Sequence, residues 1–197
     1  MEDLKWLRES GLEAAICRHA SRGGAVMGIC GGYQMLGSRL SDPEGVEAGG
    51  QMRGMGLLEA ETVFQGEKTR TRVRGRVLQA QGIFEPLAGT AFAGYEIHMG
   101  RTTSPLQAFA ELEGGKSSRD GLCAGNVFGT YVHGIFDAPG IADTILRTLC
   151  AKKGVSFDAL ATFDTRGYKE RQYDLLADVV RGGLDMSFVY RVLRREV

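Results

Sequence analysis

The chain has 197 residues, a length that suits one domain or one domain with a small appendage. Its 24 basic and 24 acidic residues balance, which excludes the strongly basic surface typical of nucleic-acid-binding proteins. The sequence contains no apolar run of the length that a membrane span requires, and its first residues do not resemble a signal peptide. The four cysteines are far apart, without C-x-x-C spacing, so we expect a reduced, cytoplasmic protein without structural zinc.

The N-terminal segment predicts a helix followed by a buried strand. Apolar residues recur at helical spacing from Asp3 to Ala20, with Asp3 as the expected N-cap and Gly11 as a candidate break. Arg22-Gly23-Gly24 ends this helix, and the apolar run Ala25-Val26-Met27 follows. The order of helix, glycine turn and apolar strand predicts a parallel α/β sheet. Because the chain opens on a helix, we expect the first strands of such a sheet to be missing from it.

A glycine-rich turn around Cys30 is the strongest signal of chemistry in the sequence. The stretch Gly28-Ile29-Cys30-Gly31-Gly32-Tyr33-Gln34 places the cysteine between a strand and a helix, which is typical of a nucleophile elbow. We expect the helix N-terminus to favour the thiolate form of Cys30. The alternative is a buried structural cysteine, but the flanking glycines favour the nucleophile.

The remainder of the chain predicts strands and then helices. The basic residues of 68–76 alternate with smaller ones, which indicates the solvated face of a strand rather than an anion site. The expected elements, in order, are a loop over 41–53, short antiparallel strands within 56–77, a strand within 92–103, a hairpin region over 111–125, a strand over 126–133 that ends in a histidine, and helices over about 139–153, 169–181 and 185–194.

A thiol nucleophile needs a general base and an oxyanion hole. His133 is the expected base, because it lies at the end of a strand, where α/β folds gather their chemistry. His98 is expected to be structural or to contact the substrate, and His19 to be a solvated helix residue. The N–H of Gly31 is the expected first oxyanion donor, and the chain offers no identifiable second donor.

Four stretches together carry a resemblance to a known family. The elbow resembles the G-x-C-x-G-x-Q motif of class I glutamine amidotransferases. Taken jointly, the stretches resemble the glutaminase domains of the cobyric acid synthase family: Gly28–Gly37, Asp42–Glu47, Gly94–Gly100 and Gly129–Asp137. The resemblance implies a flavodoxin-like α/β domain over residues 1–197, with a mostly parallel sheet flanked by helices and an antiparallel insertion. It also implies a truncated chain, without the first strands and without an N-terminal ATP-dependent amidoligase domain.

The resemblance also implies a reaction. Cys30 would attack the side-chain amide of glutamine and form a thioester, with His133 moving the protons and with Gly31 and Gln34 at the oxyanion and substrate site. The ammonia would serve the ATP-dependent amidation of adenosylcobyrinic a,c-diamide in cobalamin biosynthesis. The implied partners are glutamine, the amidoligase domain and, through that domain, the corrinoid. No cofactor is expected in this domain, whereas ATP and magnesium are expected in the amidoligase domain.

Two departures from the family pattern affect the expected activity. The usual H-x-E is replaced by His133-Gly134-Ile135, so we expect Cys30 and His133 to act as a dyad, with Asp137, Glu96 or His98 in an orienting or secondary role. No G-x-x-x-x-G-K-[ST] motif occurs, and the usual source of the second oxyanion donor is missing. Because one lost donor costs about 10²–10³ in rate, we expect the chain alone to be weakly active or inactive.

Alternative functions remain open from the sequence. The same chemistry could serve cobyrinic acid a,c-diamide synthase or an enzyme that amidates a cell-wall precursor. A different class of function is that of a truncated, non-catalytic partner domain.

Overall fold

The computed structural model describes residues 1–157 and 164–196. The chain divides into two compact units, Met1–Ala159 and Leu160–Val197. The second unit contains α5 (Thr165–Gly183) and α6 (Met186–Leu193), which confirms the two helices predicted at the C-terminal end. The domain predicted over 1–197 also includes residues 158–163 and 197, which lie outside the described residues.

The first unit opens with two short helices, α1 (Glu2–Glu9) and α2 (Leu12–Ser21). They are separated at Gly11, whose φ of 79° is a left-handed conformation that glycine adopts readily, so the predicted break is confirmed. The expected N-cap, Asp3, is wrong by two residues: the helix begins at Glu2, and Met1 is its N-cap. Leu4 is fully buried, in a cluster with Leu40 and Phe64.

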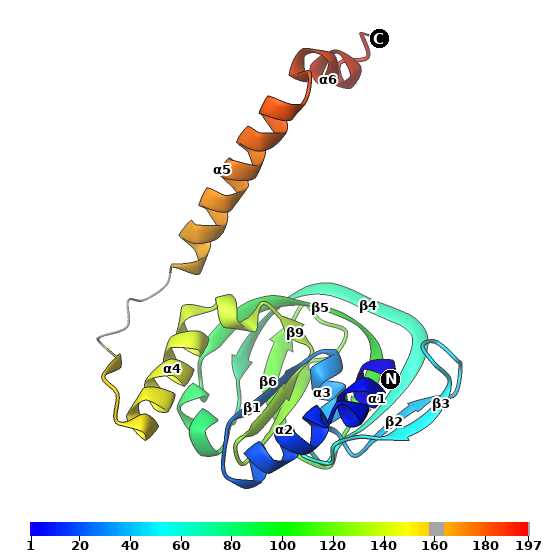
Figure 1. The fold of residues 1–197 in the computed structure, drawn as a ribbon, viewed down its shortest axis with the longest axis vertical. Coiled ribbons are helices and arrows are strands. Elements are labelled where there is room, and N and C mark those ends of the chain that lie inside the picture. The colour runs from blue at the N-terminus through cyan, green and yellow to red at the C-terminus, as the bar shows by residue number, and fades with distance from the viewer. Residues whose placement is uncertain (158–163, 197) are drawn as a thin grey trace. The chain divides into compact units, whose positions relative to one another are not determined.

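A nine-stranded mixed sheet forms the centre of the first unit (Figure 1). The order is β1-β8-β7-β6-β4-β2-β3, and β5 pairs with β4 and β9. The bounds of the strands are β1 (Val26–Ile29), β2 (Arg39–Asp42), β3 (Gly50–Arg53), β4 (Glu61–Val77), β5 (Ala91–Thr103), β6 (Ala108–Glu113), β7 (Arg119–Ala124), β8 (Val127–Thr130) and β9 (Val132–His133).

The strand directions confirm the α/β class but correct the expected proportion of parallel strands. Only the pairs β1·β8 and β2·β4 are parallel among the described strands, and the other pairings are antiparallel. The cause is the length of the central hairpin, because β4 runs without a break over 61–77 and pairs with β5 along most of that length. The short strands expected within 56–77 are therefore mainly one long strand.

The solvated face predicted for the basic run is confirmed. Lys68, Arg70, Arg72, Arg74 and Arg76 are all exposed on β4, whereas Val73 and Val77 are buried. The loop predicted over 41–53 is partly wrong, because β2 and β3 pair there as a hairpin. The Asp42 carboxylate holds the connection between them by accepting the N–H groups of Val46, Glu47 and Gly49, each at 2.8 Å.

The main core packs against β8. All four β8 residues are buried, and the Phe128 ring lies 4.3 Å from that of Phe109 and 5.7 Å from that of Phe84, between centroids. Phe84 belongs to η1 (Gly82–Leu87), and α4 (Pro139–Lys153) adds Ile141 and Ile145 to the same cluster. The C-terminal end of β8 is thus set in a packed interior. None of the described helices is both long and apolar enough to cross a bilayer.

Candidate active site

Cys30 occupies a strained turn between β1 and α3 (Gly31–Leu36). Its φ of 53° and ψ of −111° are rare for a residue with a side chain, and such strain is typical of functional sites. Close packing behind the turn requires glycine at position 28, where a Cβ would lie 2.6 Å from Leu36 Cδ1 and 2.7 Å from the carbonyl carbon of Gly32. The predicted strand, turn and helix around the cysteine are confirmed. A Cβ at Gly31 or Gly32 would meet nothing within 4 Å, so this side of the turn is open.

The thiol of Cys30 is half-buried and donates to the carbonyl of Ile97 at 3.5 Å. Burial raises its pKa, and the backbone hydrogen bond from Gly31 to the sulfur opposes this rise without cancelling it. The carboxylates of Glu47 and Asp120 raise it further. The expectation that the helix N-terminus stabilises a thiolate is therefore wrong: α3 has only six residues, and the loss of solvent prevails. A protonated thiol needs a base before it can attack.

The main chain holds His133 at the same corner of the sheet as Cys30. His133 pairs with Tyr95 on β5, and its ring stacks on the Tyr95 ring with centroids 5.1 Å apart. The Cys30 sulfur contacts Ile97, only two residues along the same strand. The N–H of Cys30 also donates to the carbonyl of Thr130 at 2.9 Å, three residues before the histidine. The buried Nε2 of His133 has no hydrogen-bond partner in the part of the chain that the structure describes.

Glu96 and His98 lie on the opposite face of β5. Glu96 pairs with Val132, and side chains alternate along a strand, so its carboxylate points away from the face that carries His133. Glu96 Oε1 is instead 3.7 Å from His98 Nε2. The Nδ1–H of His98 donates to the Gly100 carbonyl at 2.8 Å, and the ring stacks on Tyr131 with centroids 3.8 Å apart. These contacts agree with the structural interpretation of His98 and give Glu96 no direct contact with the His133 ring.

The cavity on this second face has a volume of about 680 Å³ and is lined by Glu96, His98, Asp120 and Tyr131, among others. Glu96 Oε2 and His98 Nε2 are buried there without a hydrogen-bond partner among the described residues.

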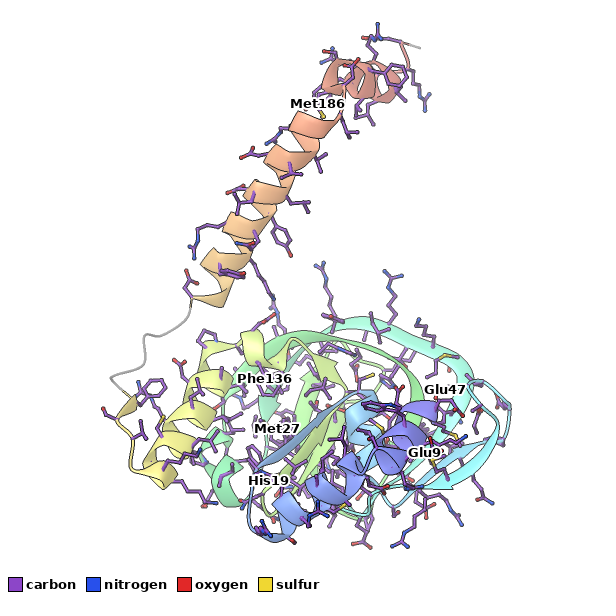
Figure 2. All side chains as sticks on the ribbon, in the orientation of Figure 1. Glu9, His19, Met27, Glu47, Phe136 and Met186 are labelled. Carbon is purple, nitrogen blue, oxygen red and sulfur yellow. The ribbon has the colours of Figure 1, made fainter. Side chains whose placement is uncertain are left out.

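Asp137 and His19 complete the predicted set. Asp137 ends η2 (Ile135–Asp137), next to Phe136, which is 37% exposed and labelled in Figure 2. A Cβ at Gly134 would lie 3.5 Å from Asp137 Oδ2, so this carboxylate is close to the backbone that follows His133. Its orienting role stays a prediction. His19, also labelled in Figure 2, is exposed on α2, as expected for a solvated helix residue.

Gln34 lies inside the protein rather than at the open side of the turn. Its Nε2 donates to the Tyr131 hydroxyl at 3.2 Å, and that hydroxyl shares a 2.6 Å hydrogen bond with Thr102 Oγ1. Gln34 is 6% exposed, so its amide supports the turn from behind. The Gly31 N–H, by contrast, faces the sulfur, which is the position expected of an oxyanion donor.

Asp120 is a buried carboxylate that the sequence reasoning missed. Its two oxygens accept the Tyr131 N–H at 3.2 and 3.1 Å, and one of them also accepts the Thr130 hydroxyl. Burial raises the pKa of Asp120 to about 6, against these hydrogen bonds, and the charge of Glu96 adds to the rise. In the sequence, Asp120-Gly121 matches a hairpin signal, and no local pattern marks its aspartate as buried.

Comparison with known proteins identifies the family. The model of the CobB/CobQ-like glutamine amidotransferase domain matches residues 1–141. The cobyric acid synthases of Ruminiclostridium cellulolyticum and Lachnoclostridium phytofermentans are 49% and 44% identical over 100% of this chain, and the matches cover 40% and 41% of those proteins. A solved structure titled "Crystal structure of glutamine amidotransferase" is 19% identical, with a TM-score of 0.48, over 74% of this chain and 71% of that one.

The chain thus spans about two fifths of the length of the curated relatives that it matches. The family model covers well over half of the chain, and the four motif stretches fall within the matched residues. The chain belongs to the CobB/CobQ-like glutamine amidotransferase domain family.

Proposed function

We propose that this chain hydrolyses glutamine at Cys30 and supplies ammonia for the amidation of a corrinoid carboxylate. The observation that carries the proposal is the strained turn of Cys30, with the Gly31 N–H at the sulfur and His133 held at the same corner by β5. The relatives named cobyric acid synthase support the corrinoid as acceptor over a cell-wall precursor.

The raised pKa of the thiol assigns the first proton transfer to His133. The imidazole takes the Cys30 proton as the sulfur attacks the amide carbon of glutamine, and the Gly31 N–H stabilises the developing oxyanion. The imidazolium then protonates the departing ammonia and leaves a thioester on Cys30. Water, deprotonated by the same imidazole, releases glutamate and restores the thiol.

Amidation itself is assigned to the part of the relatives that this chain does not span. Among residues 1–157 and 164–196, no three His, Cys, Asp or Glu side chains cluster in a way that could hold a metal ion. ATP and magnesium are proposed to act in an amidoligase domain or subunit, which corresponds to the part of the longer relatives that this chain does not span.

The proposal is tested by glutamate release together with labelling by 6-diazo-5-oxonorleucine, a glutamine analogue that alkylates the nucleophile. We expect slow glutamate release that Cys30→Ala abolishes, and a label confined to Cys30 in a peptide map. Cys150→Ser is the matched control, because Cys150 is also half-buried but belongs to α4. Equal glutamate release by the wild type and Cys30→Ala, or a label spread over the four cysteines, would contradict the glutaminase and favour a non-catalytic partner domain.

A further inference from the structure

Thr130 is connected to both members of the proposed catalytic pair. Its carbonyl accepts the N–H of Cys30 at 2.9 Å, which continues the parallel pairing of β1 with β8. Its hydroxyl accepts the N–H of Val132 at 3.1 Å, one residue before His133. A single residue thus links the backbone of the nucleophile to the backbone that carries the base.

The chain changes its pairing partner directly after Thr130. β8 lies between β1 and β7, whereas β9, which begins at Val132, pairs with β5. Between these two pairings the N–H groups of Tyr131 and Val132 are buried and need acceptors, since an unpaired buried N–H is costly. The Asp120 carboxylate accepts the first, and the Thr130 hydroxyl accepts the second.

Asp120 also determines the direction of the Thr130 hydroxyl. The hydroxyl donates its single proton to Asp120, which leaves its lone pairs for the Val132 N–H. Asp120 is 6% exposed and Thr130 is fully buried, so their hydrogen bond lies inside the protein. The two side chains therefore fix the conformation at the point where β8 ends and β9 begins.

We propose that Asp120 and Thr130 are positioning residues that hold the His133 imidazole toward the Cys30 thiol. The proposal rests on the proposed function for the roles of Cys30 and His133. The register of β9 matters because a slip of one residue against β5 would turn His133 to the face occupied by Glu96. The hydrogen bonds of the two side chains go to each other and to the backbone of Tyr131 and Val132, whereas the Cys30 thiol donates to Ile97, so the positioning acts through the backbone between the two reacting groups.

The test compares Thr130→Val, which keeps the shape but removes the hydroxyl, with Thr130→Ser, which restores it. Asn126→Ala is the matched control: the Asn126 carbonyl accepts the Val26 N–H at the other end of the same strand pair, and its side chain donates to Gly23 and accepts from Ile83. The readouts are the melting temperature, kcat and KM for glutamine, and the rate of Cys30 alkylation by iodoacetamide, read from a peptide map.

We expect Thr130→Val to lower kcat and to slow Cys30 alkylation by about tenfold or more, with KM within about twofold, because general-base assistance is worth about 10²–10⁴. Thr130→Ser restores both rates to within about threefold of the wild type, whereas Asn126→Ala lowers the melting temperature but leaves alkylation unchanged. The double variant with His133→Ala is no slower in alkylation than His133→Ala alone, because Thr130 acts through the histidine.

Asp120→Asn is the second variant, in case Thr130→Val fails to fold. It keeps the shape of the side chain but replaces one accepting oxygen with a donor. Removal of the Asp120 charge by itself lowers the pKa of the Cys30 thiol and would speed alkylation, so slowing in this variant reports the loss of positioning. Equal slowing by Asn126→Ala, or additive slowing in the double variant with His133→Ala, would overturn the positioning role. If the wild type and Cys30→Ala release glutamate equally, the proposed function is contradicted. The positioning role is still tested in that case, because the alkylation measurement requires no turnover.

Discussion

Replacing Asp120 with asparagine will change how the free energy of unfolding depends on pH. The pKa of this carboxyl is about 6 in the folded protein and 3.8 in its ordinary state, so the folded chain holds the proton more tightly. The stability that this group contributes is therefore fully present below about pH 4 and is lost as the pH rises through about 6. A gap of about two pH units corresponds to roughly 3 kcal/mol, at about 1.36 kcal/mol per unit.

The assay is urea unfolding followed by far-UV circular dichroism at several values between pH 4 and pH 7. We expect the free energy of unfolding of Asp120→Asn, relative to the wild type, to rise by about 2.5 kcal/mol over this interval. The lowered pKa values of Asp42 and Glu13 make the protein less stable as the pH falls, which is the opposite direction. Both groups are present in the wild type and in Asp120→Asn, so their contributions cancel when the two free energies of unfolding are subtracted. Asp174→Asn, at an exposed position on α5, is the control. Parallel pH profiles for the wild type and Asp120→Asn would refute the reasoning.

Two further substitutions test the elements around the site. Gly28→Ala places a Cβ against Leu36 and the backbone of Gly32. We therefore expect the free energy of unfolding, measured with heat or urea, to fall by about 1–3 kcal/mol and the glutaminase activity to fall with it. The control is Gly182→Ala, in open space on α5, which leaves the free energy of unfolding undiminished. Asp42→Ala removes the acceptor of three backbone N–H groups, so amide hydrogen exchange should accelerate in the loop between β2 and β3 while α4 stays protected; unchanged exchange in that loop would contradict this assignment.

The elbow could be predicted because its requirements are local. Glycine at position 28 is required by atoms within eight residues, and the change from strand to helix is visible in the residues on either side of Cys30. The position of His133 at the end of a strand could also be predicted from the sequence. The break between β8 and β9 at Tyr131 could not be predicted, because Thr130, Tyr131 and Val132 all favour strands. The chain turns at Tyr131 to pair with β5, a strand from a distant part of the sequence.

The electrostatics of the site depended on contacts that no short pattern contains. The helix N-terminus suggested a thiolate at Cys30, but the burial that decides the pKa comes from the whole environment of the sulfur, including β5. Asp120-Gly121 lies in the predicted hairpin region and matches a hairpin signal, which does not reveal that its aspartate is a buried acceptor facing Thr130 and Tyr131. Gln34 belongs to the catalytic motif, but its amide turns inward toward Tyr131, a residue almost a hundred positions away.

The left-handed backbone of Cys30 sets folding and chemistry against each other. A non-glycine residue in a sparsely populated conformation lowers the stability of the fold by about 1–3 kcal/mol, so glycine would be the less strained residue at position 30. Stability alone would therefore favour glycine at this position, and the proposed role of the sulfur as nucleophile opposes that preference. Stabilised versions of this domain are best sought at sites remote from this turn, where relief of strain does not erase the nucleophile.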